Sequence, residues 1–112
     1  MSSSSNSPML PPAEALSLES LVGRVTQGIG SRVLARTAGG SVTLFDFDAA
    51  QGLTEHSSPY DALVLVQSGV LNLTVGGASV EAAPGSVVRL PAGVPHAVEA
   101  VAAARMLLIM LR

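Results

Sequence analysis

Two histidines are the residues of this chain best suited to chemistry at neutral pH, because an unperturbed imidazole titrates at about pH 6.5 and its neutral form binds metals. His96 follows the stretch LPAGVP, and His56 ends the stretch FDFDAAQGLTEH. Proline fixes the backbone angle φ at positions 91 and 95, and glycine frees it at position 93. The sequence therefore predicts a stiff turn that aims His96 at a group across a cavity. Two plainer interpretations stay open: a hydrogen-bonded lining residue for His96 and an exposed loop residue for His56.

The composition excludes several classes of chemistry. Without cysteine or lysine, the chain has no thiol catalysis, thiolate metal ligand, disulfide, Schiff base or P-loop. Its 6 positive residues are all arginines and are scattered, so there is no basic stripe for nucleic acid. The start of the chain lacks the pattern of a secretory signal, and the apolar run MLLIML is too short to cross a bilayer as a helix. We expect a cytoplasmic protein with no nucleic-acid or membrane partner.

The balance of apolar and charged residues predicts an oligomer, and we expect a homodimer. Hydrophobic residues make up 48% of the chain and charged residues 12%, against about 25% charged in a typical domain. So few charges cannot cover the surface of a small monomer. The run 105–111 is apolar on both of its strand faces, so both faces need covering. One face would line the interior, and the other would meet a second subunit or, alternatively, the N-terminal segment folded back.

The chain divides into three predicted parts. Residues 1–13 are rich in serine and proline and predict a disordered tail, residues 14–30 an N-terminal arm, and residues 31–112 a single barrel domain. In this last part, short runs rich in valine and leucine alternate with glycine and proline, and no long helical pattern intervenes. The eight predicted strands are 31–35, 41–49, 62–67, 70–75, 78–82, 86–90, 96–100 and 105–111. Such a string predicts an antiparallel barrel or sandwich.

The period-two pattern assigns charged side chains to strand faces. Phe45 and Phe47 oppose Asp46 and Asp48, and we expect the two aspartates to lie on a solvated face rather than in a paired-carboxylate site. Arg89 is expected to be exposed or at an interface, because interiors rarely hold an unpaired charge.

The stretch around His96 resembles the second sequence motif of the cupin superfamily. That motif reads glycine, five residues, proline, one residue, glycine, two residues, histidine. Gly85, Pro91, Gly93 and His96 match every one of these positions. The chain is also similar to small single-domain bacterial cupins of the RmlC-like, cupin 2 conserved barrel type. The resemblance implies an all-β fold, the double-stranded β-helix or jelly-roll barrel, with both histidines near the mouth of an apolar lumen.

The first cupin motif is matched only in part. It reads glycine, a histidine-any-histidine pair, a glutamate, six residues and a glycine. His56 matches the first histidine and Gly69 the closing glycine, but Ser58 stands at the second histidine and Ala62 at the glutamate. Cupins with the full pattern hold a divalent metal with three histidines and a glutamate. The resemblance therefore implies a depleted metal site with two histidine ligands.

The expected site can be stated by residue. The predicted pocket residues are His56, Ser58, Tyr60 and His96, of which His56 and His96 would be the metal ligands. The metal would be zinc, iron, nickel, manganese or copper. Because two ligands fall short of the usual three or four, water, substrate or a neighbour would complete the shell, with Tyr60, Glu55 and Asp61 as candidates. A metal-free polar pocket is the other interpretation.

The fold leaves the function open, and three hypotheses remain. The first is a binding module that holds a small molecule in the barrel lumen. The second is a metal-dependent cupin enzyme, similar to a dioxygenase or an isomerase, acting on a small organic substrate. The third is a structural dimer with a vestigial pocket.

Overall fold

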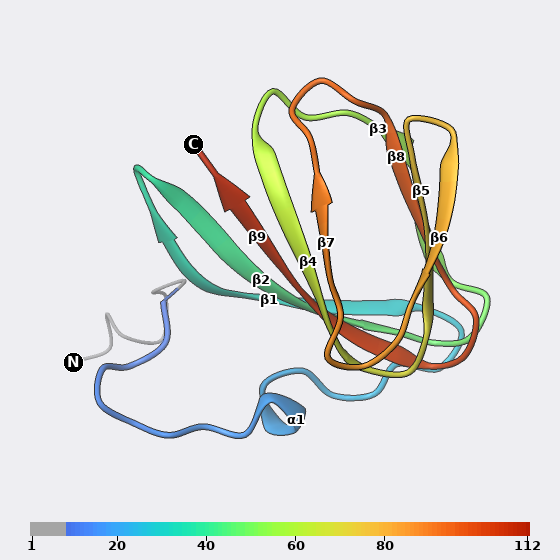
Figure 1. The fold of residues 1–112 in the computed structure, drawn as a ribbon. Helices are drawn as coiled ribbons and strands as arrows, with labels where there is room; N and C mark the ends of the chain where they lie inside the picture. The colour runs from blue at the N-terminus through green and yellow to red at the C-terminus, as the bar shows by residue number, and fades with distance from the viewer. Residues whose placement is uncertain (1–8) are drawn as a thin grey trace.

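The computed structural model describes residues 9–112, and in this range it contains one short helix and nine strands. In chain order they are α1 (Leu18–Leu21), β1 (Ile29–Thr37), β2 (Gly40–Phe47), β3 (Gly52–His56), β4 (Asp61–Ser68), β5 (Leu71–Val75), β6 (Ala78–Ala82), β7 (Val87–Leu90), β8 (His96–Ala100) and β9 (Ala104–Leu111). The strands form two antiparallel sheets, with the orders β1-β2-β9-β4-β7 and β3-β8-β5-β6. Figure 1 shows the five-stranded sheet on the left and the four-stranded sheet on the right. The predicted all-β jelly roll is confirmed.

One strand was not predicted from the sequence. β3 carries the residues GLTEH, in which Leu53 is the one large apolar side chain, so the period-two pattern of a half-buried strand is absent. β3 pairs with β8 at the edge of the four-stranded sheet, with an irregularity between Leu53 and His56. His56 is consequently the last residue of an edge strand.

The space between the two sheets is filled with apolar side chains. Five of these side chains are fully buried, and they come from both sheets: Phe47, Val64, Leu71, Leu73 and Met106. The face of β2 that carries Phe45 and Phe47 points into this core, and so does the face of β9 that carries Met106, Leu108 and Met110. Burial of this core removes apolar surface from water and is the main stabilising term of the fold. The packed interior also confines any polar site to the rim of the barrel.

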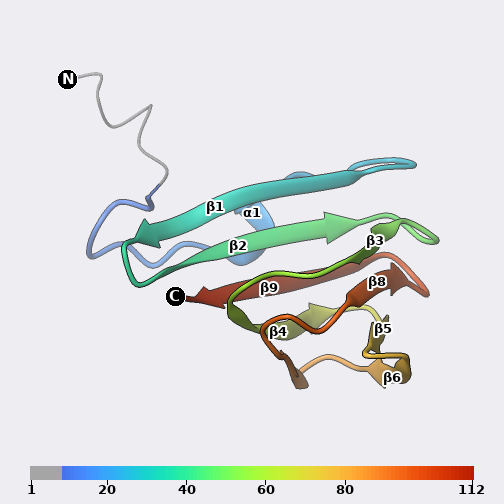
Figure 2. The same cartoon turned by 90° about the horizontal axis from the view of Figure 1, so that it is seen from above.

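The outer face of the five-stranded sheet is covered at one end by the N-terminal arm. Leu18, Leu21 and Val22 pack there against Leu44 of β2 and Leu107 of β9. Figure 2 shows α1 lying against the sheet near β1 and β2. The alternative in which the N-terminal segment folds back therefore holds for this end of β9.

The predicted tail, residues 1–13, falls partly outside the described residues, since 1–8 are not described. Leu10 packs against the same outer cluster and donates its backbone N–H to the carbonyl oxygen of Leu34 in β1, at 2.8 Å. The arm thus contacts the sheet from residue 10 onward. No helix in the described range is long and apolar enough to span a bilayer.

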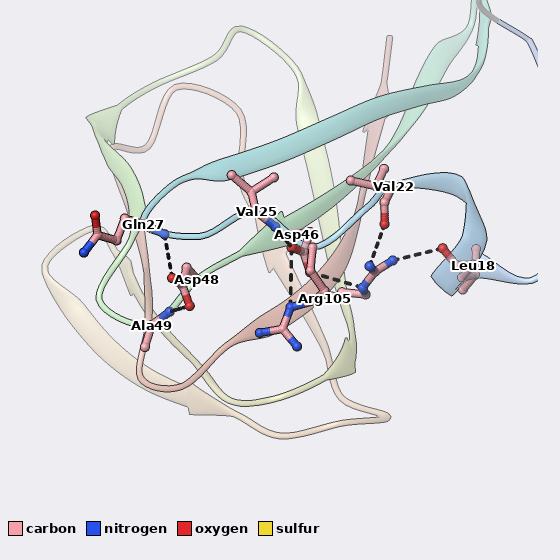
Figure 3. Close-up of polar contacts among 9 residues, drawn as sticks. Leu18, Val22, Val25, Gln27, Asp46, Asp48, Ala49 and Arg105 are labelled. Carbon is pink, nitrogen blue, oxygen red and sulfur yellow. Dashed lines mark hydrogen bonds and ion pairs between the residues drawn. The ribbon is translucent and has the colours of Figure 1, made fainter.

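A buried ion pair fixes the arm to the sheet. The Nε atom of Arg105 lies 3.1 Å from Oδ1 of Asp46, and both side chains are buried. The guanidinium also donates to the carbonyl oxygens of Leu18, at 3.1 Å, and Val22, at 2.6 Å, while Oδ2 of Asp46 accepts the backbone N–H of Val25 at 3.3 Å. Figure 3 shows Arg105 and Asp46 next to each other, with dashed lines to Leu18, Val22 and Val25 of the arm. Arg105 and Asp46 thus pair with backbone groups of the arm that would otherwise be covered without a hydrogen-bond partner.

The prediction that both aspartates lie on a solvated face is wrong for Asp46, whose exposed fraction is 1%. The reason is that the arm covers this part of the sheet and brings backbone N–H groups to it. Asp48, the residue after the end of β2, accepts the backbone N–H of Gln27 at 2.6 Å and that of Ala49 at 2.9 Å. These two hydrogen bonds, that from Gln27 first, lower the pKa of the Asp48 carboxyl.

Replacing Arg105 by leucine tests the importance of the buried pair. The substitution leaves the Asp46 carboxylate buried without its cation, and breaking a buried pair from one side typically costs about 3–5 kcal/mol. We expect urea denaturation to show the free energy of unfolding lowered by about 3 kcal/mol or more.

Arg24 is the matched control, because its Nε lies 4.0 Å from Asp46 but its side chain is 68% exposed. Arg24→Leu is expected to cost less than about 1 kcal/mol, as exposed ion pairs do. Equal losses for the two substitutions would show that the buried pair has no special part in holding the arm.

Candidate functional site

The two histidines meet at one end of the four-stranded sheet. β3 ends at His56 and β8 begins at His96, and these residues are register partners. Their Nε2 atoms are 3.2 Å apart, and the ring centroids are 4.4 Å apart with one ring edge-on to the other. His96 is buried and His56 is exposed, so the pair lies at the rim of the barrel. This end carries the β3–β4 and β7–β8 connections, drawn at the top of Figure 1.

A turn just before β8 sets the position of His96. The backbone N–H of Val94 donates to the carbonyl oxygen of Pro91 at 3.2 Å, and Gly93 between them has φ +76°. This is the positive φ that a type II turn requires at its third position, and glycine adopts it without strain. The N–H of Gly93 donates in turn to the carbonyl oxygen of Ser58 at 2.7 Å. That bond ties the segment before His96 to the segment after His56.

Further contacts hold the same turn. Oδ1 of Asp61 accepts the backbone N–H of Ala92 at 2.9 Å and lies 3.3 Å from a terminal nitrogen of Arg89. The carbonyl oxygen of Pro95 accepts the N–H of Gly76, in the β5–β6 hairpin, at 2.8 Å. Arg89 is exposed, in agreement with the sequence-based expectation. The turn is thus held by groups from both sheets, and the Asp61 carboxylate is engaged in holding it.

The second nitrogen of each ring faces a backbone carbonyl. Nδ1 of His56 lies 2.7 Å from the carbonyl oxygen of Thr54, and Nδ1 of His96 lies 3.2 Å from that of Val94. A carbonyl oxygen only accepts hydrogen bonds, so these contacts assign the proton of each neutral ring to Nδ1. Both Nε2 atoms are then left with lone pairs. Two lone pairs directed at each other repel unless a proton or a metal ion lies between them.

The environment of His96 keeps its ring neutral. Burial lowers the pKa of the His96 imidazole, the hydrogen bond to Val94 partly opposes this, and repulsion from His56 lowers the pKa further. At neutral pH the Nε2 lone pair of His96 is therefore free to bind a cation other than a proton.

The structure places the other predicted pocket residues on the loop that follows His56. The Oγ atom of Ser58 accepts the backbone N–H of Tyr60 at 3.2 Å. Tyr60 is exposed, and the guanidinium carbon of Arg112 lies 5.4 Å from the centroid of its ring. The two histidines contact each other. Ser58 instead contacts the backbone of Tyr60, and the ring of Tyr60 lies near Arg112.

The carboxylates suggested as additional ligands do not converge on the histidines. In the range 9–112, no group of three or more histidine, cysteine, aspartate or glutamate side chains is placed to hold a metal ion. Glu55 is exposed, and Asp61 binds the turn at Ala92. Within the described residues, the imidazole nitrogens of His56 and His96 are thus the histidine and carboxylate groups that meet at this site.

Sequence reasoning missed the two backbone carbonyls that orient the rings, those of Thr54 and Val94. Every residue has a carbonyl group, so no residue type marks these positions. Both carbonyls belong to the residue two places before a histidine, and this spacing is the one signal that could have found them.

Comparisons with known proteins agree with this architecture. A family model described as a cupin domain matches residues 43–111. A solved structure of a conserved protein of unknown function from Streptococcus pyogenes is 34% identical, with a TM-score of 0.86, covering 92% of this chain and 90% of that one. A comparison with curated proteins found no match.

Two further solved structures are similar. A cupin superfamily protein from Desulfitobacterium hafniense DCB-2 is 27% identical with a TM-score of 0.84, covering 91% of this chain and 94% of that one. A cupin 2 conserved barrel domain protein from Leptotrichia buccalis is 32% identical with a TM-score of 0.79, covering 83% of this chain and 45% of that one. The family match and the jelly-roll topology show that the chain belongs to the cupin superfamily.

Proposed function

We propose that this cupin binds a small molecule at the mouth of its barrel, anchored by a divalent metal ion on the Nε2 atoms of His56 and His96. The observation that carries the proposal is the pair of Nε2 atoms 3.2 Å apart, each on a ring whose Nδ1 faces a carbonyl oxygen. A metal ion between the two nitrogens would replace lone-pair repulsion by two coordinate bonds.

The residues present fit two positions of a metal shell. Nitrogen atoms 3.2 Å apart can both lie about 2.0–2.1 Å from one ion, the usual bond length from histidine to zinc. Ligating histidines typically donate their second ring N–H to a carbonyl or carboxylate, as both rings do here. Neutral imidazole suits zinc, iron, nickel and copper, with manganese a further candidate. Bound there, the ion would act as a Lewis acid on an oxygen atom of the ligand.

The barrel mouth, rather than its depth, is the place for the ligand. The inward side chains of both sheets fill the space between them. His56 is exposed, so a molecule can approach the histidine pair from solvent. Water and the small molecule would occupy the remaining positions on the metal, with Ser58 and Tyr60 on the loop beside them. The ligand would thus be a small molecule with an oxygen or nitrogen atom able to coordinate.

A metal-dependent enzyme, similar to a dioxygenase or an isomerase, is the second candidate. Catalytic metal sites keep coordination positions open for substrate, and a shell with two protein ligands leaves more of them open than usual. The two candidates differ in one observable, since an enzyme releases a product and a binding module returns its ligand unchanged.

Calorimetric titration of metal-free protein with zinc or nickel tests the anchor. We expect about one ion per chain, and a loss of affinity of at least tenfold in His56→Gln and in His96→Gln, because each removes one of two ligand atoms. Glu55→Gln is the matched control and should bind like the wild type. Absence of metal binding, or equal binding in His96→Gln, would contradict the proposal.

A pair of glycine substitutions tests whether the turn positions His96. Gly93 and Gly85 have φ of +76° and +88°, and a Cβ at either would have nothing within 4 Å. Alanine at each therefore carries a similar backbone cost of about 1–2 kcal/mol. We expect Gly93→Ala to weaken metal binding beyond what Gly85→Ala does, because only Gly93 adjoins the histidines. Identical affinities in the two variants would show that the turn does not set the site.

The pKa of His96 predicts how metal-free protein responds to acid. Unfolded histidine titrates at about pH 6.5 and folded His96 lower, so below about pH 6.5 the unfolded state binds more protons and stability falls. Urea denaturation with a chelator present, at about pH 7.5 and 5.5, should show this loss in the wild type and in His56→Gln.

In His96→Gln the part of the loss due to this residue disappears. Unperturbed carboxyl groups titrate at about pH 4, below this window. Full wild-type pH dependence in His96→Gln would mean that the ring is not held neutral by burial.

A further inference from the structure

We infer that Asp61 is a positioning residue for the proposed metal site, because its carboxylate holds the turn before β8 and, through that turn, the ring of His96. Asp61 begins β4 in the five-stranded sheet, whereas His96 begins β8 in the four-stranded sheet. Figure 1 shows the starts of both strands at the same end of the barrel. The inference rests on the proposed function where it concerns metal affinity, but its claim about the His96 ring stands without a metal.

The Asp61 carboxylate reaches the turn through one oxygen atom. Oδ1 accepts the backbone N–H of Ala92 at 2.9 Å and also lies 3.3 Å from a terminal nitrogen of Arg89. A hydrogen bond from an amide to an ionised carboxylate is roughly twice as strong as one between neutral groups. The ion pair is weaker in comparison, because the Arg89 and Asp61 side chains are 63% and 46% exposed and solvent screens their charges. The bond to Ala92 is therefore the one that fixes the turn.

A short series of contacts leads from Ala92 to the His96 ring. The backbone N–H of Val94 donates to the carbonyl oxygen of Pro91 at 3.2 Å, so Ala92 and Gly93 are the two central residues of the turn. The carbonyl oxygen of Val94 lies 3.2 Å from Nδ1 of His96. Movement of Ala92 therefore shifts the carbonyl group that orients the ring.

The turn needs a support from outside, because stiffness alone does not place it. Pro91 and Pro95 restrict its backbone angles, but a stiff turn can still move as a unit. The N–H of Gly93 ties it to the carbonyl oxygen of Ser58 at 2.7 Å. Asp61 adds a bond from a side chain, which a substitution removes while every backbone donor and acceptor of the turn stays in place.

The two rings depend on Asp61 to different degrees. The His56 ring is oriented by the carbonyl oxygen of Thr54, at 2.7 Å, within the same strand β3. The His96 ring is oriented by the carbonyl oxygen of Val94, at 3.2 Å, in the turn that Asp61 holds. The longer of these two hydrogen bonds is the weaker one and the more easily lost. Removal of the Asp61 carboxylate therefore loosens the His96 ring and leaves the His56 ring as it is.

Nitrogen-15 NMR of the imidazoles in the full, metal-free chain at about pH 8 tests the positioning directly. In Asp61→Ala we expect the ratio of the two neutral tautomers of His96 to shift about fivefold toward the Nε2–H form, the factor that one lost hydrogen bond typically produces. The His56 spectrum and the circular dichroism spectrum should not change. An unchanged His96 spectrum, or an equal change in both rings, would overturn the inference.

Two conservative variants separate the hydrogen bond from the ion pair. Asp61→Asn retains an oxygen atom that can accept the Ala92 N–H but carries no charge. Arg89→Gln is the matched control, because it removes the ion pair and leaves the bond to Ala92 in place. We expect both variants to keep the His96 tautomer ratio within about twofold of the wild type. An Asp61→Asn chain that behaves like Asp61→Ala would contradict the role of the hydrogen bond.

Calorimetric titration with zinc extends the test to metal affinity. We expect Asp61→Ala to bind zinc about fivefold more weakly than the wild type, because the Nε2 lone pair of His96 is then less often available. Asp61→Asn and Arg89→Gln should bind like the wild type, and equal affinity in Asp61→Ala would overturn the claim about affinity. If no chain binds zinc while the His96 tautomers shift as expected, the proposed function fails and the positioning of His96 by Asp61 stands.

Discussion

The site depends on the pairing of His56, the last residue of β3, with His96, the first residue of β8. A backbone carbonyl two residues before each histidine fixes the orientation of its ring. The carbonyl oxygens of Thr54 and Val94 accept from the Nδ1 atoms, so the Nε2 atoms are directed at each other. Neither ring can turn away without losing a hydrogen bond, and the buried His96 has the less freedom of the two. We propose that a pair held in this way is preorganised to bind a metal ion.

The rest of the barrel mouth supports that pair. Gly93 gives its N–H to Ser58 and allows the turn that leads into β8, and Asp61 holds the same turn from the other sheet. The apolar core below excludes water and leaves the rim as the place where polar groups can gather. On the opposite side of the five-stranded sheet, the Arg105–Asp46 pair fixes the arm and so decides which part of the outer face stays open. The site at the end of the four-stranded sheet and the outer face of the five-stranded sheet are thus organised by different polar contacts.

Much of the fold, but less of the site, could be predicted from the sequence. Alternating apolar residues in β2 and β5 revealed the strand faces, and the spacing from Gly85 to His96 revealed the barrel motif. β3 was missed, because GLTEH lacks alternation and takes its strand conformation from pairing with β8. Asp46 was expected in solvent, since its own strand gives no sign that a segment about 20 residues earlier covers it. The ring-orienting carbonyls left no mark in residue type, so the tautomers could be assigned only from coordinates.

The measurement that tests the central claim most directly is a nitrogen-15 NMR spectrum of the two imidazoles in metal-free protein at about pH 8, above the pH of about 6.5 at which an unperturbed imidazole titrates. Couplings between ring nitrogens and carbon-bound protons identify which nitrogen carries the hydrogen. The geometry predicts the Nδ1–H tautomer for both His56 and His96. A spectrum in which either ring is in the Nε2–H form would contradict this assignment. One ring would then donate a hydrogen bond to the other, and the two Nε2 lone pairs would not both be available to a metal ion.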